Sequence, residues 1–272
     1  MNAACYRFQR GIFEFVIVKD GTGGTRSLSE LVDPVPRDLT SCEIDMEGGI
    51  MVVDAPDQRF LVDGGNGPLQ GPRQHRAEVA LEKEGIPYAS IDTVLLTHGD
   101  PDHISGLLTQ NGDLACPDAQ YVMNIDLWRA LYSEPGAGLY FPSQTKLISQ
   151  LARLIEGRCT LLEMEREIWP GVRVIPAPGH RVGHSIFRFG SLDQGFYHIG
   201  DAAFHPLFLE RPDLLIPSEY RPAQACATRA MIAQRALAER ARIVGSHFRV
   251  TNVGALTPSS VAGQYRWFEP SQ

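Results

Sequence analysis

The segment from Thr97 to His103 constrains this chain more than any other. It reads Thr-His-Gly-Asp-Pro-Asp-His and directly follows the apolar run 93–96. Two imidazoles and two carboxylates therefore lie within six residues, a density that surface turns seldom have. A strand that ends in such a cluster can direct several nitrogen and oxygen donors to one point, and these donors suit zinc, iron or manganese. The sequence predicts a metal site at the end of a buried strand.

Three further candidate ligands follow downstream, each in a short segment that contains glycine. His180 follows Gly179, Asp201 follows Gly200, and His247 comes two residues after Gly245. Glycine lets the backbone turn sharply, so a side chain at a strand end can face a shared cavity. We therefore expect these side chains to converge with those of the first motif.

The pattern of apolar and breaking residues predicts both hairpins and alternating strands and helices. Strands are expected at 11–19, 50–53, 59–62, 91–96, 172–175, 185–190, 196–199 and 243–244, and helices at 73–84, 125–132, 143–155 and 222–240. This mixture favours a mixed α/β sandwich over a strictly parallel, doubly wound sheet. Residues 1–272 are expected to form a single domain. The Gly-rich break at 20–24 and two prolines predict a long loop or extended N-terminal arm around 20–47.

Composition narrows the cellular location of the protein and the classes of partner that it can bind. The net charge of −7 argues against nucleic acid as the main partner. The five cysteines contain no CxxC, which disfavours a disulfide framework or a thiolate metal site. The N-terminal ten residues lack the apolar part of a secretory signal, and no apolar stretch is long enough to cross a membrane. We expect a cytoplasmic protein with a small-molecule substrate, no nucleic acid and no membrane partner. The 9–18 strand and the arm leave a homodimer open.

The order of these residues resembles the metallo-β-lactamase superfamily. That family has a His-x-His-x-Asp-His motif after a strand, then a Gly-His, an Asp and a final His, and its early Asp-Gly motif is similar to Asp63-Gly64-Gly65 here. The closest similarity is to the branch that holds methyl parathion hydrolase and the N-acyl-homoserine lactonases. Softer matching segments are 11–15, 200–206, 211–213, 228–229, 246–248 and 263–267. The resemblance implies a four-layer αββα sandwich of two mixed β-sheets flanked by helices.

The resemblance also implies a role for each site residue. His98, Asp100 and His180 would bind one metal ion, and Asp102, His103 and His247 a second. Asp201 would bridge both, opposite a bridging hydroxide, and Asp102 would also act as the catalytic general acid and base. Outer supporting roles fall to Asp63 and His184. The implied cofactor is two divalent metal ions, zinc first, with iron, manganese or a single ion left open.

Two positions depart from the family pattern. Asp100 stands where the family has its second motif histidine, which makes the site richer in oxygen ligands. Phe204 stands where lactonases of this branch place a tyrosine, and a phenyl ring cannot donate a hydrogen bond to a substrate carbonyl. Phe204 and His205 are therefore the expected substrate-binding residues, with His205 as a substitute donor.

These features predict a metal-dependent hydrolase that uses a metal-activated hydroxide, most readily on a lactone or a related ester. Hydrolysis of a phosphotriester, a phosphodiester or a β-lactam is an alternative. A different class is also open, namely a metal-binding protein whose hydrolytic activity Asp100 has altered or abolished. Residues 134–140 are expected either to line the substrate pocket or to pack against a helix.

Overall fold

The computed structural model describes residues 5–68, 77–132, 145–193 and 195–269. A seven-stranded sheet contains, in spatial order, β1 (Cys5–Arg10), β2 (Phe13–Ser27), β3 (Glu43–Ala55), β4 (Gln58–Val62), β5 (Thr93–Leu95), β6 (Gln120–Asn124) and β7 (Cys159–Leu162). The strands β1 to β4 pair antiparallel, whereas β4 to β7 pair parallel. The first sheet is therefore mixed.

The second sheet has five strands in the order β12 (Arg242–Val244), β11 (Phe196–His198), β10 (Ser185–Phe189), β9 (Val172–Pro176) and β8 (Arg166–Trp169). Only β11 and β12 pair parallel within it. A small antiparallel pair, β13 (Ala255–Pro258) with β14 (Tyr265–Phe268), stands apart.

The described α-helices are α1 (Ala77–Lys83), α2 (Pro101–Ile104), α3 (Ile125–Tyr132), α4 (Thr145–Ile155), α5 (Leu207–Glu210) and α6 (Pro222–Ala238). Short 3-10 turns lie at Leu28–Glu30, Arg37–Leu39, Tyr88–Ser90 and Ser105–Leu107. Pro222 starts α6, where a missing backbone N–H costs nothing because no helical acceptor faces it. Among the described residues, no helix is both long and apolar enough to cross a lipid bilayer.

Strand residues of the first sheet alternate between two buried clusters. Phe15 and Ile17 of β2 face the cluster shared with the second sheet, whereas Val16 and Val18 face the cluster beneath α1, α3 and α4. Successive strand side chains point to opposite faces, so a strand that is apolar on both sides must be covered on both. This explains why the sheet is sandwiched between helices and a second sheet.

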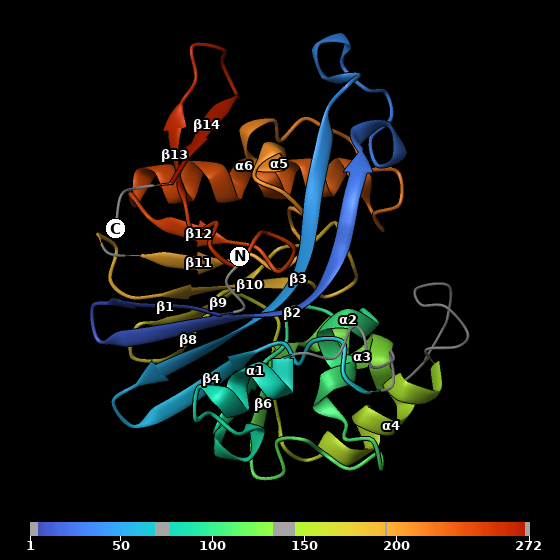
Figure 1. Cartoon of the computed structure of the whole chain (residues 1–272), viewed down its shortest axis with the longest axis vertical. Coiled ribbons are helices and arrows are strands. Elements are labelled where there is room, and N and C mark those ends of the chain that lie inside the picture. The colour runs from blue at the N-terminus through green and yellow to red at the C-terminus, as the bar shows by residue number, and fades with distance from the viewer. Residues whose placement is uncertain (1–4, 69–76, 133–144, 194, 270–272) are drawn as a thin grey trace.

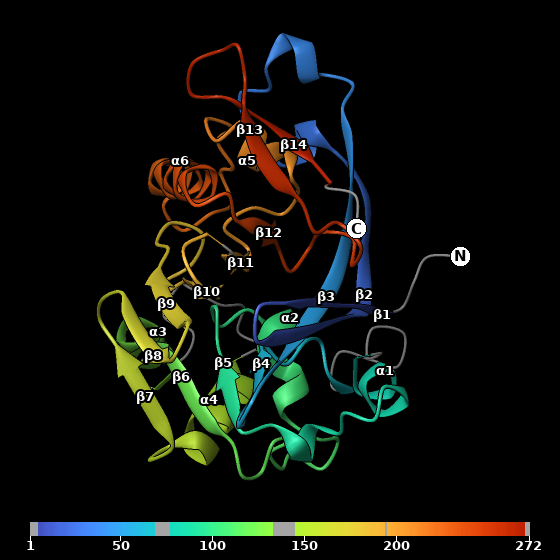
Figure 2. The ribbon, with the colours of Figure 1, turned by 90° about the vertical axis from the view of Figure 1, so that its left-hand side faces the viewer.

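Figures 1 and 2 show the resulting layers, with α1, α3 and α4 beside the first sheet and α6 beside the second. The strands β2 and β3 run from the first sheet along the second toward α5. The predicted αββα sandwich of two mixed sheets is confirmed. The loops after the parallel strands β4 and β5, and after the parallel pair β11 and β12, carry most of the predicted site residues, as is usual in α/β proteins. His180 and His184 lie instead in the loop between the antiparallel strands β9 and β10.

The prediction of a loop or arm around residues 20–47 is wrong at both ends. β2 continues to Ser27 and β3 begins at Glu43, and the two pair antiparallel along this length. Two register shifts, between Lys19 and Gly21 and between Thr22 and Gly24, absorb the glycines that were expected to end the strand. Glycine at a bulge lets a strand continue with a local bend. The proline-containing part between the strands holds the two 3-10 turns.

Most other predicted elements are confirmed, including the hairpins β3–β4 and β10–β11 and the helix α6. The first residues of the expected helices at 73–84 and 143–155, and the whole 134–140 segment, lie outside the described residues. Six strands were not predicted, namely β1, β6, β7, β8, β13 and β14.

Candidate metal centre

The motif at 98–103 owes its shape to a strand that turns directly into a short helix. After β5 the chain passes through the fully buried His98 and then begins α2 at Pro101. Proline at the first helical position holds the preceding Asp100 in an extended conformation, with φ −68° and ψ 148°. This reversal brings the rings of His98 and His103 within 4.0 Å of each other, centroid to centroid. Local sequence alone thus places two imidazoles side by side.

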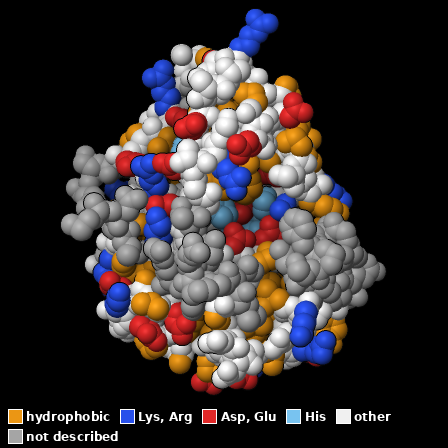
Figure 3. Space-filling model, turned by 45° about the vertical axis from the view of Figure 1, so that its right-hand side comes forward, with side chains coloured by type: hydrophobic (Ala, Val, Ile, Leu, Met, Phe, Trp, Pro, Cys, Tyr) orange, Lys and Arg blue, Asp and Glu red, His pale blue; other side chains and the backbone are white. Residues whose placement is uncertain are grey.

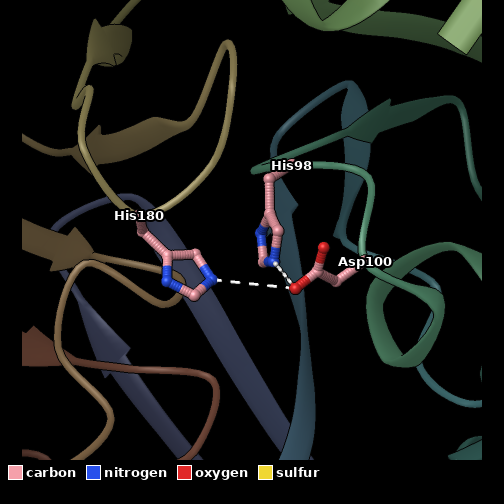
Figure 4. Close-up of side chains that lie close together, drawn as sticks. All are labelled: His98, Asp100 and His180. Carbon is pink, nitrogen blue, oxygen red and sulfur yellow. Dashed lines mark ion pairs between the residues drawn. The ribbon is translucent and has the colours of Figure 1, made fainter. Parts of the chain in front are cut away.

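One cluster of candidate ligands comprises His98, Asp100 and His180, which we call the first group. Asp100 Oδ2 lies 3.6 Å from His98 Nε2 and 3.8 Å from His180 Nε2 (Figure 4). His180 arrives from the loop between β9 and β10, on the other sheet. Three donors from two sheets therefore face one point.

A second cluster comprises Asp102, His103 and His247, which we call the second group. Asp102 Oδ2 lies 3.8 Å from His103 Nε2 and 3.5 Å from His247 Nε2. His247 comes from the loop after β12. In Figure 3, histidine and acidic side chains lie together in a hollowed part of the surface.

Asp201 lies between the two groups. Its Oδ2 is 3.9 Å from His98 Nε2, 3.7 Å from His180 Nε2 and 3.0 Å from His247 Nε2, and its Oδ1 is 3.3 Å from His103 Nε2. The preceding Gly200 adopts φ +52°, and a Cβ there would come within 2.9 Å of His184 Nε2. Glycine is therefore required for the turn that brings Asp201 into the centre. The structure brings together all seven side chains that the resemblance assigned to the metals.

Three of the four histidines have their Nδ1 atoms bonded away from the centre. His103 Nδ1 donates to Asp63 Oδ2 at 2.8 Å, and His247 Nδ1 donates to the backbone oxygen of Glu47 at 2.8 Å. His98 Nδ1 lies 2.9 Å from the Thr97 hydroxyl, which itself donates to Asp63 Oδ2 at 2.7 Å. Since a carboxylate only accepts, the hydroxyl is left to accept from His98. Each of these three rings therefore directs its Nε2 to the centre, and this nitrogen can bind a metal once it carries no proton.

Four of the atoms that face the centre have no hydrogen-bond partner within the described protein. His98 Nε2, His103 Nε2, His180 Nε2 and Asp201 Oδ1 are buried and make no hydrogen bond. Buried polar atoms are nearly always satisfied, so a set of orphaned donors at one point indicates a missing partner that accepts electron pairs. These four free atoms, set among four imidazoles and three carboxylates, fit divalent zinc, iron or manganese.

The two groups differ in charge. Burial lowers the pKa of His98 and of His180 well below the usual value, so both rings are neutral. Burial acts against protonation of His247 too, but Asp201 and then Asp102 outweigh it and raise its pKa to about 9. The pKa of His103 is likewise raised well above its usual value by Asp201, Asp102 and Asp63, against the effect of burial. Without metal, the second group therefore holds protons and the first does not.

Asp63 and Asp201 are the buried carboxylates that balance these protons. Burial alone would raise the pKa of each. For Asp63 the neighbouring His103 overrides it, and for Asp201 His247 and His103 do, so both pKa values are lowered. Both carboxylates are therefore ionised at neutral pH.

The remaining predicted residues surround the centre at different depths. His184 lies behind Asp201, and its Nε2 accepts the Asp201 backbone N–H at 3.2 Å. The Phe204 ring packs edge-on against His180 and His247, at centroid distances of 5.2 and 5.8 Å. His205 points elsewhere, because its Nδ1 accepts the Leu207 N–H and its ring lines a polar pocket with Asp45 and Arg249. Phe204 therefore borders the centre more directly than His205.

Sequence reasoning missed several residues that hold the centre. The Glu47 side chain binds Lys19 at 2.6 Å and accepts the Val250 N–H at 3.1 Å, while its backbone holds His247. No motif marks Glu47, since it lies 200 residues from its histidine partner. Thr97 precedes His98 directly, and its hydroxyl beside a ligand was a signal that local sequence offered.

A buried ion pair lies behind His180 and was not predicted either. Arg229 is fully buried and donates to both carboxylate oxygens of Glu219, at 3.0 and 3.1 Å. Glu219 Oε1 lies 3.9 Å from His180 Nδ1, beyond hydrogen-bond distance. Burial raises the pKa of Glu219 to about 7, although Arg229 opposes this. His180 is thus the one histidine of the centre whose Nδ1 is not held by a hydrogen bond.

Known proteins are similar to this chain in one segment of sequence and in the whole fold. Residues 48–109 match the family model described as the metallo-beta-lactamase superfamily, a segment that contains Asp63 and the entire 98–103 motif. No curated protein matches the chain.

Solved structures match over nearly the full length at low identity. The dizinc quorum-quenching lactonase AidC has a TM-score of 0.84 and 18% identity, over 100% of this chain and 99% of its own. The hydrolase AbOPH of the beta lactamase superfamily has a TM-score of 0.80 and 20% identity, over 99% and 98%. An N-acyl homoserine lactone hydrolase with N-hexanoyl-L-homoserine at its catalytic metal center has a TM-score of 0.64 and 15% identity, over 90% and 94%. The resemblance inferred from the motifs is confirmed: residues 48–109 match the metallo-β-lactamase superfamily, and the described chain has that superfamily's fold.

Proposed function

We propose that this protein is a metal-dependent hydrolase that opens a lactone or cleaves a related ester. The observation that carries the proposal is the convergence, between the two sheets, of the Nε2 atoms of three histidines and Asp201 Oδ1, none of which has a hydrogen-bond partner in the described protein. His98, Asp100 and His180 would hold one divalent ion, Asp102, His103 and His247 the other, and Asp201 would touch both. Zinc is the first choice of metal, because imidazole and carboxylate together are its common ligands.

Two divalent ions at this centre would supply Lewis acidity, which lowers the pKa of water toward neutrality and polarises a carbonyl oxygen. The chain's own part is to fix the ligands and to move protons. Asp102 suits the second task because 39% of its side chain is exposed, compared with 4% for Asp201. A carboxylate that reaches solvent can take a proton from water and return it to a leaving group.

The surroundings of the centre favour a neutral carbonyl substrate over an anionic phosphodiester. Arg181, the arginine that contacts the centre, already donates to Asp100 and to the backbone oxygens of His180 and Ser218. Its Nε and Nη1 are therefore already engaged, which disfavours a bidentate contact with a phosphate. Phe204 adds an apolar ring edge beside His180 and His247, which suits the hydrocarbon part of an ester or lactone.

The similar solved structures support the same choice. AidC is described as a dizinc lactonase, and another similar structure as an N-acyl homoserine lactone hydrolase with its product at the metal center. Because the centre draws residues from both sheets, we also propose that residues 1–272 act as one domain. A homodimer stays a prediction.

The test is metal analysis combined with a substrate panel. Protein loaded with zinc, manganese or iron(II) is dialysed, its metal content is measured, and it is assayed on N-acyl-homoserine lactones, simple lactones, aryl esters, a phosphotriester, a phosphodiester and a β-lactam. We expect two ions per chain and turnover of lactones or esters that a chelator abolishes and added metal restores. Protein that binds no metal, or that turns over only phosphoesters or β-lactams, contradicts the proposal.

A further inference from the structure

Both carboxylate oxygens of Asp100 accept a hydrogen bond from one arginine. Arg181 Nε donates to Asp100 Oδ1 at 3.0 Å and to Oδ2 at 2.9 Å, while the same Oδ2 faces His98 and His180. Arg181 directly follows His180 in the loop between β9 and β10, so one loop supplies both a candidate ligand and the partner of another. We propose that Arg181 is a positioning residue that holds Asp100 in the centre and offsets its charge. This inference rests on the metal centre of the proposed function.

The Asp100 carboxylate does not cap α2, although its position in the chain would allow it to. Asp100 is the N-cap residue of α2, where an aspartate side chain commonly accepts a hydrogen bond from the first turn of the helix. Here the side chain makes no such capping bond. Its two oxygens instead accept from Arg181, which leaves lone pairs of Oδ2 for a further partner beside His98 and His180. Without Arg181, capping of α2 would compete for the carboxylate.

Arg181 is itself held at several points, so it can act as a fixed support. Its Nη1 donates to the backbone oxygen of His180 at 2.9 Å and lies 3.3 Å from that of Ser218. The side chain is 24% exposed and that of Asp100 is 17% exposed, which places the pair at the rim of the centre. A guanidinium fixed at both ends positions a carboxylate better than a mobile ammonium would.

Charge gives Arg181 a second effect. Three of the seven candidate ligands are carboxylates, and a neutral ligand at position 100 would leave two. The single positive charge of Arg181 offsets one carboxylate. The ligands together with Arg181 therefore have the net charge of a site with only two carboxylates. The Asp100–Arg181 pair is thus electrostatically equivalent to one neutral ligand, which preserves the Lewis acidity that a third carboxylate would weaken.

Positioning and charge predict opposite effects on metal affinity when Arg181 is removed. Loss of a nearby positive charge would tighten metal binding, but a partly exposed charge is worth at most about fivefold. Loss of a partner that orients a ligand typically costs about 10–100-fold. Positioning therefore dominates, and removing Arg181 is expected to weaken the metal site of the first group.

A double-mutant cycle with Asp100 separates positioning from general damage. Zinc affinity and occupancy are measured by competition with a chromophoric chelator for wild type, Arg181→Met, Asp100→His and the double variant. Visible spectra of the cobalt(II) forms report ligand geometry independently of activity. We expect Arg181→Met to lose about 10–100-fold in affinity at one of two sites and to alter the cobalt spectrum. In the Asp100→His background the same change should cost nothing, because no carboxylate remains to be held.

Conservative variants and a surface control complete the experiment. Arg181→Lys keeps the charge and a donor, so it should lose less affinity than Arg181→Met, and it remains informative if the methionine variant misfolds. Arg129→Met removes an arginine that pairs with Asp126 on the surface of α3 and should leave both metal sites unchanged. Unchanged affinity in Arg181→Met, or an equal loss in the Asp100→His background, would overturn the inference. Wild-type protein that binds no metal would instead overturn the proposed function.

Discussion

The two halves of the centre use similar residue types but balance their charge differently. In the first group His98 and His180 are neutral, and Asp100 is offset by Arg181. In the second group both histidines hold protons in the metal-free protein, with Asp201 and Asp102 as counter-ions. The first group is therefore ready for a cation, whereas the second must release protons to accept one. Matching ligands thus do not imply matching affinities, because the partners behind the ligands set the charge.

Removal of Asp201 should weaken metal binding in both groups, because this carboxylate lies within 4 Å of histidines in both. We expect Asp201→Ala to lose most of both metals, by more than the roughly 100-fold that loss of an outer partner costs. Elemental analysis after dialysis measures this, with the exposed Asp57→Ala as control. Full metal content in the Asp201 variant would show that it does not join the two groups.

Asp63 and Thr97 allow the two halves to be weakened separately. Asp63 binds His103 directly and His98 only through the Thr97 hydroxyl. Asp63→Asn should weaken metal binding by about 10–100-fold, chiefly at the second group, whereas Thr97→Val should affect only the first. Asparagine suits this position because the backbone there has φ 59°. Zinc titrations in which both variants weaken the same site would contradict this assignment.

The difference in protonation should be visible in the pH dependence of metal binding. His247 has a pKa of about 9, so its proton must leave when metal binds below that pH. Affinity of the second group should rise by about tenfold per pH unit for each proton released and level off above about pH 9. The first group should release no protons at neutral pH, because its rings are already neutral.

Calorimetric titration at pH 7.5 in buffers of different ionisation enthalpy counts these protons for each metal. His247→Asn should lower the number of protons released when metal binds to the second group. Equal proton release on binding of each of the two metals would contradict the predicted difference between the groups. The same raised pKa stabilises the metal-free fold. That contribution is complete below the unfolded value of about 6.5 and is lost as pH rises through about 9.

The smallest expected effect concerns Phe204, whose ring touches a histidine of each group. Phe204→Tyr adds a hydroxyl that can donate to a substrate carbonyl, and one such bond is worth up to about tenfold. We expect a rise of that order or less in kcat/KM for lactones, with metal content unchanged. Phe204→Leu, which adds no donor, is the matched control, and an equal rise in both variants would exclude hydrogen bonding as the cause.

The parts of the fold that could be predicted are those whose signal is local. The 98–103 motif, the hairpin β3–β4 and the helix α6 each follow from residues that are neighbours in the chain. The strand through the glycines of β2 was missed because its pairing with β3, which holds the bulges in place, is a tertiary contact. Short strands such as β6 and β7 were missed because few residues carry the apolar pattern.

By itself, the sequence determined which donors are present and that His98, Asp102 and His103 share one segment directly after a buried strand. It also determined, through Gly200, that the chain can turn sharply before Asp201. Only the tertiary structure decided what stands behind each donor: Arg181 beside Asp100, Glu47 holding His247, and no hydrogen bond on His180 Nδ1. The physical reason is that donor chemistry belongs to single residues, whereas charge and orientation depend on partners brought together from 81 to 200 residues away.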